Sequence, residues 1–117
     1  LVADRDLSAV DFVLFHTGWD RFWGTENYYR HWPWLSDELA EVLASSNLKG
    51  VGLDVPSLDH KTKTIAHDLC ASSSMVNIEN LTALESLADT IVQFMALPMK
   101  LYQTEASPVR AVAWLQD

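Results

Sequence analysis

Short β-prone apolar runs alternate with short helical patterns along this sequence, and that alternation most constrains its fold. Apolar residues at 10–15 and 51–54 predict buried strands, and Pro56 ends the second because proline donates no hydrogen bond to a sheet. Between them, Ser36 can cap a helix whose apolar residues recur at helical spacing and which stops before Gly50. We therefore expect the α/β class, with a mixed β-sheet and short flanking helices.

The later part of the chain continues this pattern. Beyond Pro56 we expect a helix, a strand, a brief helix and two further strands, at residues 64–72, 75–79, 82–87, 91–97 and 109–115. Successive side chains of a strand point to opposite faces, so Ile78 lies on one face and Glu79 on the other.

Composition narrows the classes of partner. The formal net charge is −8 and the sequence has no basic run, which argues against a nucleic-acid groove or an anionic membrane surface. The single cysteine, Cys70, cannot form an internal disulfide. The sequence contains no apolar run of about 18 residues, and we expect a cytoplasmic protein.

His67 and Glu79 flank an apolar stretch in the segment HDLCASSSMVNIENL, residues 67–81. A neutral imidazole nitrogen and a carboxylate oxygen are both good ligands for zinc or manganese. Two ligands alone do not hold a catalytic metal, and unpaired residues of these types are common at protein surfaces. The pair is therefore a candidate for part of a metal site, with surface placement as the alternative.

An aromatic segment, residues 19–34, holds seven of the chain's aromatic residues. Aromatic rings supply a large contact area with few rotatable bonds, so they suit a flat aromatic substrate or a subunit interface. Packing beneath a long loop is the alternative. We expect the segment to border the site or a subunit contact, with at least Trp19 and Trp23 substantially buried.

Two aspartates, Asp54 and Asp59, lie in LDVPSLDH near the end of an expected strand, where site residues often collect. Short carboxylates also cap turns, and this reading of both residues stays open.

Four ordered pieces resemble the later half of the putative cyclase family, which includes bacterial kynurenine formamidase and isatin hydrolase. They are VLFHTGW, GVGLDVPSLDH, HDLCASSSMVNIENL and ALPMKLYQTEASPVRAVAW. The resemblance implies a cyclase-like swivelling β/β/α fold and a metal-dependent hydrolase of an amide bond, of the arylformamidase or cyclic amide type. It places His67 and Glu79 on the family's two C-terminal ligands for zinc or manganese, with Glu79 also catalytic. Trp19, Trp23 and Asp54 are the expected substrate contacts.

The family signature H-x-G-T-H-x-D-x-P, which carries the remaining metal ligands, does not occur in this sequence. The chain also begins at Leu1 rather than methionine. We therefore expect residues 1–117 to be the C-terminal half of a single domain, inactive alone and partnered by the missing N-terminal half, a small-molecule amide and further copies of itself. The alternative is a non-catalytic binding or assembly module on the same scaffold.

Overall fold

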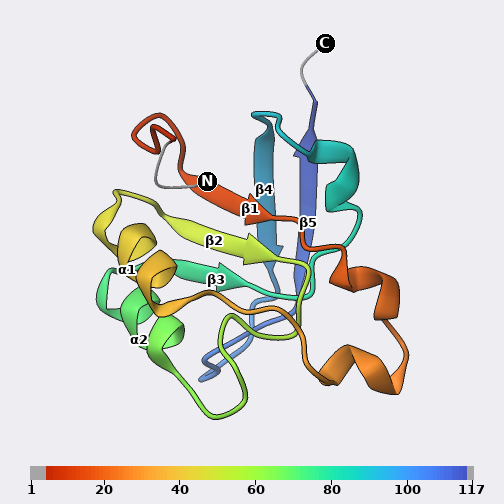
Figure 1. Cartoon of the computed structure of the whole chain (residues 1–117). Coiled ribbons are helices and arrows are strands. Elements are labelled where there is room, and N and C mark those ends of the chain that lie inside the picture. The colour runs from red at the N-terminus through yellow and green to blue at the C-terminus, as the bar shows by residue number, and fades with distance from the viewer. Residues whose placement is uncertain (1–4, 116–117) are drawn as a thin grey trace. The chain divides into compact units, whose positions relative to one another are not determined.

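The computed structural model describes residues 5–115 of the chain (Figure 1). Leu1, on which part of the expectation of a missing half rests, lies outside these residues. The chain divides into two compact units, the first ending at Glu85 and the second beginning at Ser86. Among the described residues, no helix has both the length and the apolar character that crossing a membrane requires.

The first unit is built on a three-stranded parallel sheet in the order β1-β2-β3. One helix lies in each crossover, and the two helices pack against each other (Figure 1). This architecture confirms the α/β class, with the ends of the elements displaced by a few residues from the sequence prediction. The elements are β1 (Phe12–Phe15), α1 (Asp37–Ser45), β2 (Gly50–Leu53), α2 (Ile65–Ser72) and β3 (Val76–Ile78).

The core of the first unit lies between the two helices and one face of the sheet. Helix α1 begins where the sequence predicts, because the Ser36 side chain accepts a hydrogen bond from the Leu39 N–H at 3.2 Å. Its buried residues meet those of α2 and of the central strand β2. The buried cluster is Trp32, Leu35, Ala40, Leu43, Leu48, Val51, Leu53, Val55, Leu58, Ala66, Cys70 and Met75.

The opposite face of the sheet is shaped by two glycines. A Cβ at Gly50 would collide with the Phe12 ring and lie 2.6 Å from the Val76 carbonyl oxygen. A Cβ at Gly52 would lie 2.7 Å from a side-chain carbon of Leu14. The side chains of β1 therefore occupy the space that side chains of β2 would otherwise fill.

Helix α2 is capped from a distance. Asp59, only 4% exposed, accepts hydrogen bonds from the backbone N–H groups of Ala66 and His67, both at 3.0 Å. Burial alone would raise the pKa of the Asp59 carboxyl. The N–H donors of Ala66 and His67, together with the His67 ring, lower that pKa below its ordinary value of 3.8. The carboxylate thus stays charged and holds the first turn of α2.

The aromatic segment is more regular than a loop. It contains two short 3₁₀ helices, η1 (Trp19–Phe22) and η2 (Glu26–Tyr29). A third, η3 (Leu84–Leu87), stands where the sequence predicts a brief helix at 82–87.

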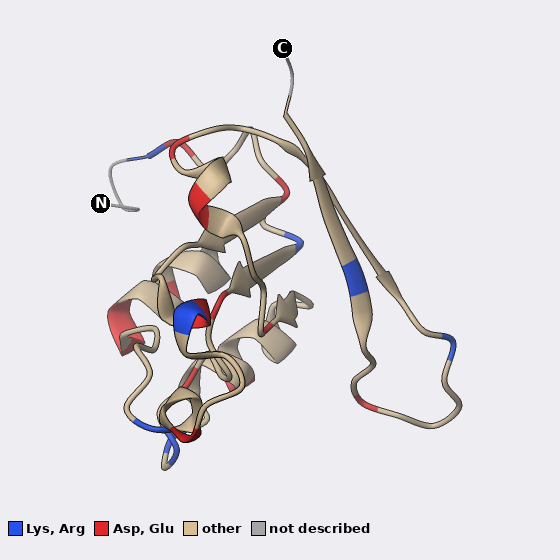
Figure 2. Cartoon of the chain, turned by 90° about the vertical axis from the view of Figure 1, so that its right-hand side faces the viewer, with Lys and Arg blue, Asp and Glu red and all other residues tan. Residues whose placement is uncertain are grey.

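The second unit is an antiparallel hairpin of β4 (Gln93–Pro98) and β5 (Val109–Trp114). Residues opposite each other in the register share a face. Arg110, the charged residue within the two strands (Figure 2), lies opposite Leu97 on a face that also presents large apolar side chains, which are 37–56% exposed. We call this set the hairpin face: Met95, Leu97, Val112 and Trp114. A two-stranded hairpin is only marginally stable alone, so this face favours a covering partner.

We expect Gly50→Ala to lower the free energy of unfolding by about 3 kcal/mol and Gly52→Ala by about 1–2 kcal/mol. The Val76 backbone cannot move away from a new Cβ cheaply, whereas the Leu14 and Leu81 side-chain ends near Gly52 can. Urea unfolding of the two variants tests this. Each variant is the other's control, because both make the same change to the unfolded chain. A larger loss for Gly52→Ala would contradict the packing described.

We expect Asp59→Asn to lower the free energy of unfolding at about pH 7 by about 1–3 kcal/mol. Because the pKa of Asp59 is lowered in the folded chain, its stabilisation is present above the ordinary value of 3.8 and is lost as the pH falls through the folded value. The difference between variant and wild type should therefore shrink at acid pH. Urea unfolding at several pH values measures this difference. The control is Asp68→Asn, which changes an exposed carboxylate in the first turn of α2, the turn that Asp59 caps. A difference independent of pH would refute the charged cap.

Candidate metal centre

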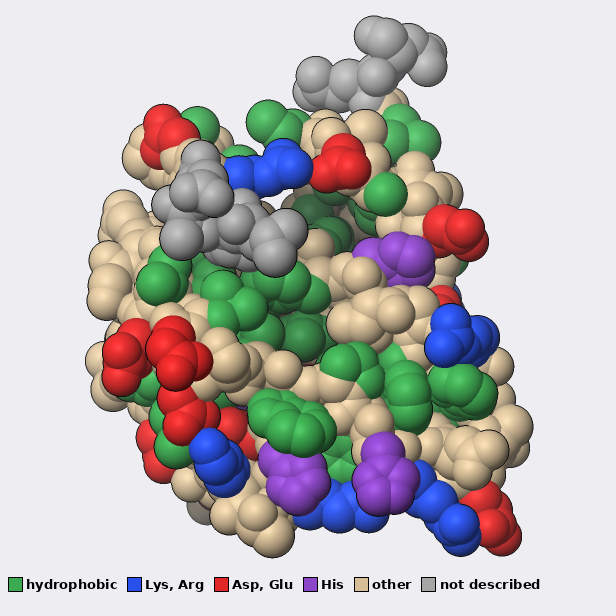
Figure 3. Space-filling view, viewed as in Figure 1, with side chains coloured by type: hydrophobic (Ala, Val, Ile, Leu, Met, Phe, Trp, Pro, Cys, Tyr) green, Lys and Arg blue, Asp and Glu red, His purple; other side chains and the backbone are tan. Residues whose placement is uncertain are grey.

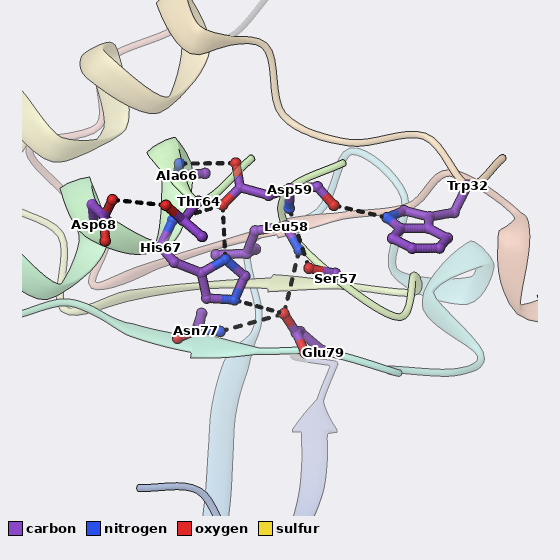
Figure 4. Close-up of polar contacts among 10 residues, drawn as sticks. All are labelled: Trp32, Ser57, Leu58, Asp59, Thr64, Ala66, His67, Asp68, Asn77 and Glu79. Carbon is purple, nitrogen blue, oxygen red and sulfur yellow. Dashed lines mark hydrogen bonds and ion pairs between the residues drawn. The ribbon is translucent and has the colours of Figure 1, made fainter. Parts of the chain in front are cut away.

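His67 and Glu79 meet although they come from different elements (Figure 4). His67 lies in the first turn of α2, and Glu79 follows β3 by one residue. The Nε2 atom of His67 and the Oε1 atom of Glu79 are 3.2 Å apart. The strand alternation explains this approach, because Asn77 pairs with Val51 on the sheet face that the helices cover and Glu79 points the same way. The structure thus brings together the two residues that the family resemblance gives as metal ligands, and metal binding by them stays a prediction.

Asp59 sets the orientation of the His67 ring. Its Oδ2 atom lies 2.8 Å from Nδ1 of His67 (Figure 4). An ionised carboxylate only accepts hydrogen bonds, so Nδ1 carries the proton and donates it to Asp59. The nitrogen directed at Glu79 is therefore Nε2. Metal-binding histidines commonly use one ring nitrogen for the ion and the other for such a carboxylate.

The separation of the two groups fits a shared cation. A neutral His67 with its proton on Nδ1 presents a lone pair at Nε2, and Glu79 presents another, so the contact needs a proton or a metal ion between them. Two ligands held at about 2.0–2.1 Å by a tetrahedral ion lie about 3.3 Å apart. The observed 3.2 Å is consistent with that geometry. The donor set of one imidazole and one carboxylate suits zinc or manganese.

Glu79 is held by further contacts on the same oxygen. Its Oε1 atom accepts a hydrogen bond from the Leu58 N–H at 3.3 Å and lies 3.5 Å from Nδ2 of Asn77. The Glu79 side chain is partly buried, with 24% of its surface exposed. These contacts aim Oε1 at His67.

Asp54 has a different role from the substrate contact that the sequence analysis expects. It is fully buried, and its two oxygens accept hydrogen bonds from the Thr17 N–H, the Thr17 hydroxyl and the Gly18 N–H at 2.7–3.0 Å. Asp54 therefore fixes the turn after β1, which is the capping role kept open for it. A fully buried carboxylate with both oxygens engaged has no surface to offer a substrate.

A second group, His16, Asp20 and Asp54, also brings ligand atoms together, all within 4.8 Å of one another. The hydrogen bonds from Thr17 and Gly18 place two donors on each oxygen of Asp54. Because a carboxylate has about four lone-pair sites, these contacts must be broken before Asp54 can ligate a metal. The His67–Glu79 pair is the better-prepared centre.

The aromatic segment is only partly buried. Trp19 is half-buried and donates its Nε1–H to the Tyr28 carbonyl at 2.9 Å. Trp23 is 56% exposed, so the expectation of its burial is wrong; its ring stands edge-on to Tyr28 at 4.9 Å. The rings that are buried are Tyr28 and Trp32. Trp23 stays solvated because the core beneath it is already closed by Tyr28.

Two aromatic rings of the segment, the exposed Trp34 and the buried Trp32, contact residues of the loop at 60–61. Trp34 packs against His60 with ring centroids 4.7 Å apart, and Lys61 lies over the ring of Trp32. Figure 3 shows hydrophobic, histidine and cationic side chains side by side at the lower edge of the molecule.

Two features of the centre were missed by the sequence analysis. The sequence analysis leaves Asp59, like Asp54, open between a site residue and a turn cap, and it does not pair Asp59 with His67. The Tyr28 hydroxyl donates to Oδ1 of Asn80 at 2.9 Å, next to Glu79, across 52 residues of sequence. No local sequence signal identifies that contact.

Comparison with known proteins gives relatives of this chain. An uncharacterised protein of Methanocaldococcus jannaschii is 31% identical over 110 residues, which are 93% of this chain and 56% of that protein. The kynurenine formamidase of Bordetella avium is 35% identical over 92 residues, which are 77% of this chain and 42% of that protein. The chain therefore spans about half the length of the relatives it matches.

Solved structures agree with the fold. A structure described as a potential metal-dependent hydrolase with cyclase activity has a TM-score of 0.71 and 26% identity, covering 96% of this chain and 54% of that one. An isatin hydrolase bound to a product analogue has a TM-score of 0.82 at 24% identity, covering 91% of this chain and 45% of that one, and shows the fold alone. The sequence model of the Putative cyclase family matches residues 2–60, half of the chain. This chain belongs to the putative cyclase family.

Proposed function

We propose that this chain supplies His67 and Glu79 to the divalent-metal centre of an amide hydrolase. The observation that carries the proposal is the 3.2 Å approach of His67 Nε2 to Glu79 Oε1, with Nδ1 of His67 committed to Asp59. The family membership and the names of the relatives support a metal-dependent hydrolase.

A divalent ion held by His67 and Glu79 would supply a water of lowered pKa and would polarise the amide carbonyl. The residues of this chain would hold the ion and orient the groups around it. Because Nδ1 of His67 donates to Asp59, Nε2 is the ring atom that would face a bound ion. The described contacts of Glu79 fall on its Oε1 atom. Its Oε2 atom is therefore the one that would accept a proton from the attacking water.

The remaining metal ligands come from a complementing segment. About three protein ligands are usual for a catalytic zinc, and two come from here. The relatives carry about as much chain again outside the match. We assign the hairpin face to the same partner, because its exposed apolar side chains on a two-stranded hairpin call for a cover. A second copy of the chain is the competing occupant, and it would appear as a homo-oligomer.

The proposed substrate is an aryl formamide or a cyclic aryl amide. Trp23 offers an exposed ring beside Tyr28, whose hydroxyl contacts the residue after Glu79. A planar aryl group stacked on Trp23 would lie close to the metal centre. The relative named kynurenine formamidase supports the aryl formamide.

We expect the 117-residue chain alone to bind zinc or manganese weakly and to lack amide hydrolysis, because two ligands give reversible binding. Fusing or adding the unmatched segment of the Methanocaldococcus jannaschii relative should produce tight binding and hydrolysis of an aryl formamide or of isatin. Calorimetric metal titration and an absorbance assay measure the two properties.

In that complemented protein, Glu79→Ala should abolish metal binding and hydrolysis together. Glu85→Ala, an exposed carboxylate in η3, is the matched control and should change neither. Tight one-to-one binding by the chain alone would show that the centre is misplaced. Hydrolysis without metal would overturn the mechanism, and complementation that restores neither property favours a non-catalytic module.

We expect Trp23→Ala to raise the KM for an aryl formamide about ten-fold with little change in kcat, because a stacked ring contributes uniform binding of about 1–1.5 kcal/mol. Trp34→Ala removes a ring of similar exposure that packs on His60 and is the control. Steady-state kinetics on the complemented protein measure both. An equal effect of the two changes would argue against a specific aryl contact at Trp23.

A further inference from the structure

Tyr28 is a buried residue of the aromatic segment that several contacts hold in place. It is 1% exposed, and its ring lies edge-on between Trp23, at 4.9 Å, and Tyr29, at 5.1 Å. Its carbonyl accepts the Trp19 Nε1–H. These contacts fix the ring, so its hydroxyl has one direction in which to donate.

The hydroxyl meets a strained residue. Asn80 has φ of 61°, in the left-handed region that asparagine tolerates better than most residues. Its side-chain Oδ1 accepts the Tyr28 O–H at 2.9 Å, and its N–H donates to the Val55 carbonyl at 2.9 Å. The backbone reverses at Asn80, directly after Glu79, so the conformation held at Asn80 sets where the Glu79 side chain starts.

The electrostatics agree with this proximity. Burial raises the pKa of Tyr28 to about 12, and Tyr29 and the carboxylates of Asp54, Asp20 and Glu79 add to that effect. The hydroxyl therefore carries its proton at neutral pH and acts as a donor.

We propose that Tyr28 is a positioning residue for Glu79, acting through its hydrogen bond to Asn80. The inference rests on the proposed function, because it concerns the direction of a carboxylate at the metal centre. It joins the aromatic segment to that centre by a polar contact, so this segment serves metal binding as well as substrate contact.

The test is zinc titration of the 117-residue chain, followed by the NMR signals of the His67 ring. Tyr28→Phe keeps the packed ring and removes the hydroxyl, and it should raise the zinc Kd about two- to ten-fold, as loss of one hydrogen bond implies. Tyr29→Phe is the matched control at the neighbouring, 59% exposed tyrosine and should leave the Kd unchanged. Asn80→Gly keeps the left-handed backbone and removes the acceptor, and it should weaken binding to the same degree.

The double variant Tyr28→Phe with Asn80→Gly should bind zinc no more weakly than either single variant, because both remove one contact. Thermal unfolding confirms that each variant is folded at the titration temperature. A wild-type Kd in Tyr28→Phe, alongside lost binding in His67→Ala, would overturn the positioning role and leave the proposed metal site standing. Equal zinc binding by wild type and His67→Ala would overturn the proposed function itself, and this inference with it.

Discussion

The carboxylate of Asp59 is the contact on which the candidate centre depends. One buried group accepts two backbone N–H bonds at the start of α2 and the Nδ1–H of His67. The first two place the helix, and the third turns the ring. The same carboxylate therefore determines both the position of His67 and the ring nitrogen that faces Glu79. Without Asp59, α2 would lose its cap and the His67 ring would lose its orientation.

The sheet supplies the other half of the centre. Parallel pairing of β2 with β3 aligns their side chains, so the residue beyond β3 that points toward the helices is Glu79. A shift of one residue in this register would turn Glu79 to the opposite face, away from His67. The approach of His67 to Glu79 is thus a consequence of strand pairing and of one buried cap.

The sequence predicted the elements better than their contacts. β-Branched and aromatic runs identified the strands, and Ser36 identified the start of α1, because these signals are local. The pairing of His67 with Glu79 came from the family resemblance together with strand alternation. Asp54 and Asp59 look alike in LDVPSLDH, and only the fold shows that the first faces Thr17 and the second faces α2.

The aromatic residues illustrate the same limit. Trp23 and Tyr28 are equally apolar in sequence, but the core accommodates one ring and leaves the other at the surface. Which of the two rings is buried depends on the tertiary packing around each position, and composition carries no information on that packing. Hydrogen bonds across 52 residues, such as that of Tyr28 to Asn80, are beyond any local pattern.

The glycines of β2 have a consequence for how this family can vary. Phe12 lies over Gly50 and Leu14 lies over Gly52. On that face of the sheet, a side chain of β1 therefore fills space beside each glycine. A side chain at position 52 could be accommodated by shorter residues at positions 14 and 81, because the nearest atoms there are side-chain ends, whereas at position 50 the Val76 carbonyl oxygen at 2.6 Å would still block a Cβ if Phe12 were shortened. Of the two glycines, Gly52 therefore marks the position where volume can be exchanged between neighbouring side chains, and Gly50 the position where the backbone of β3 forbids it.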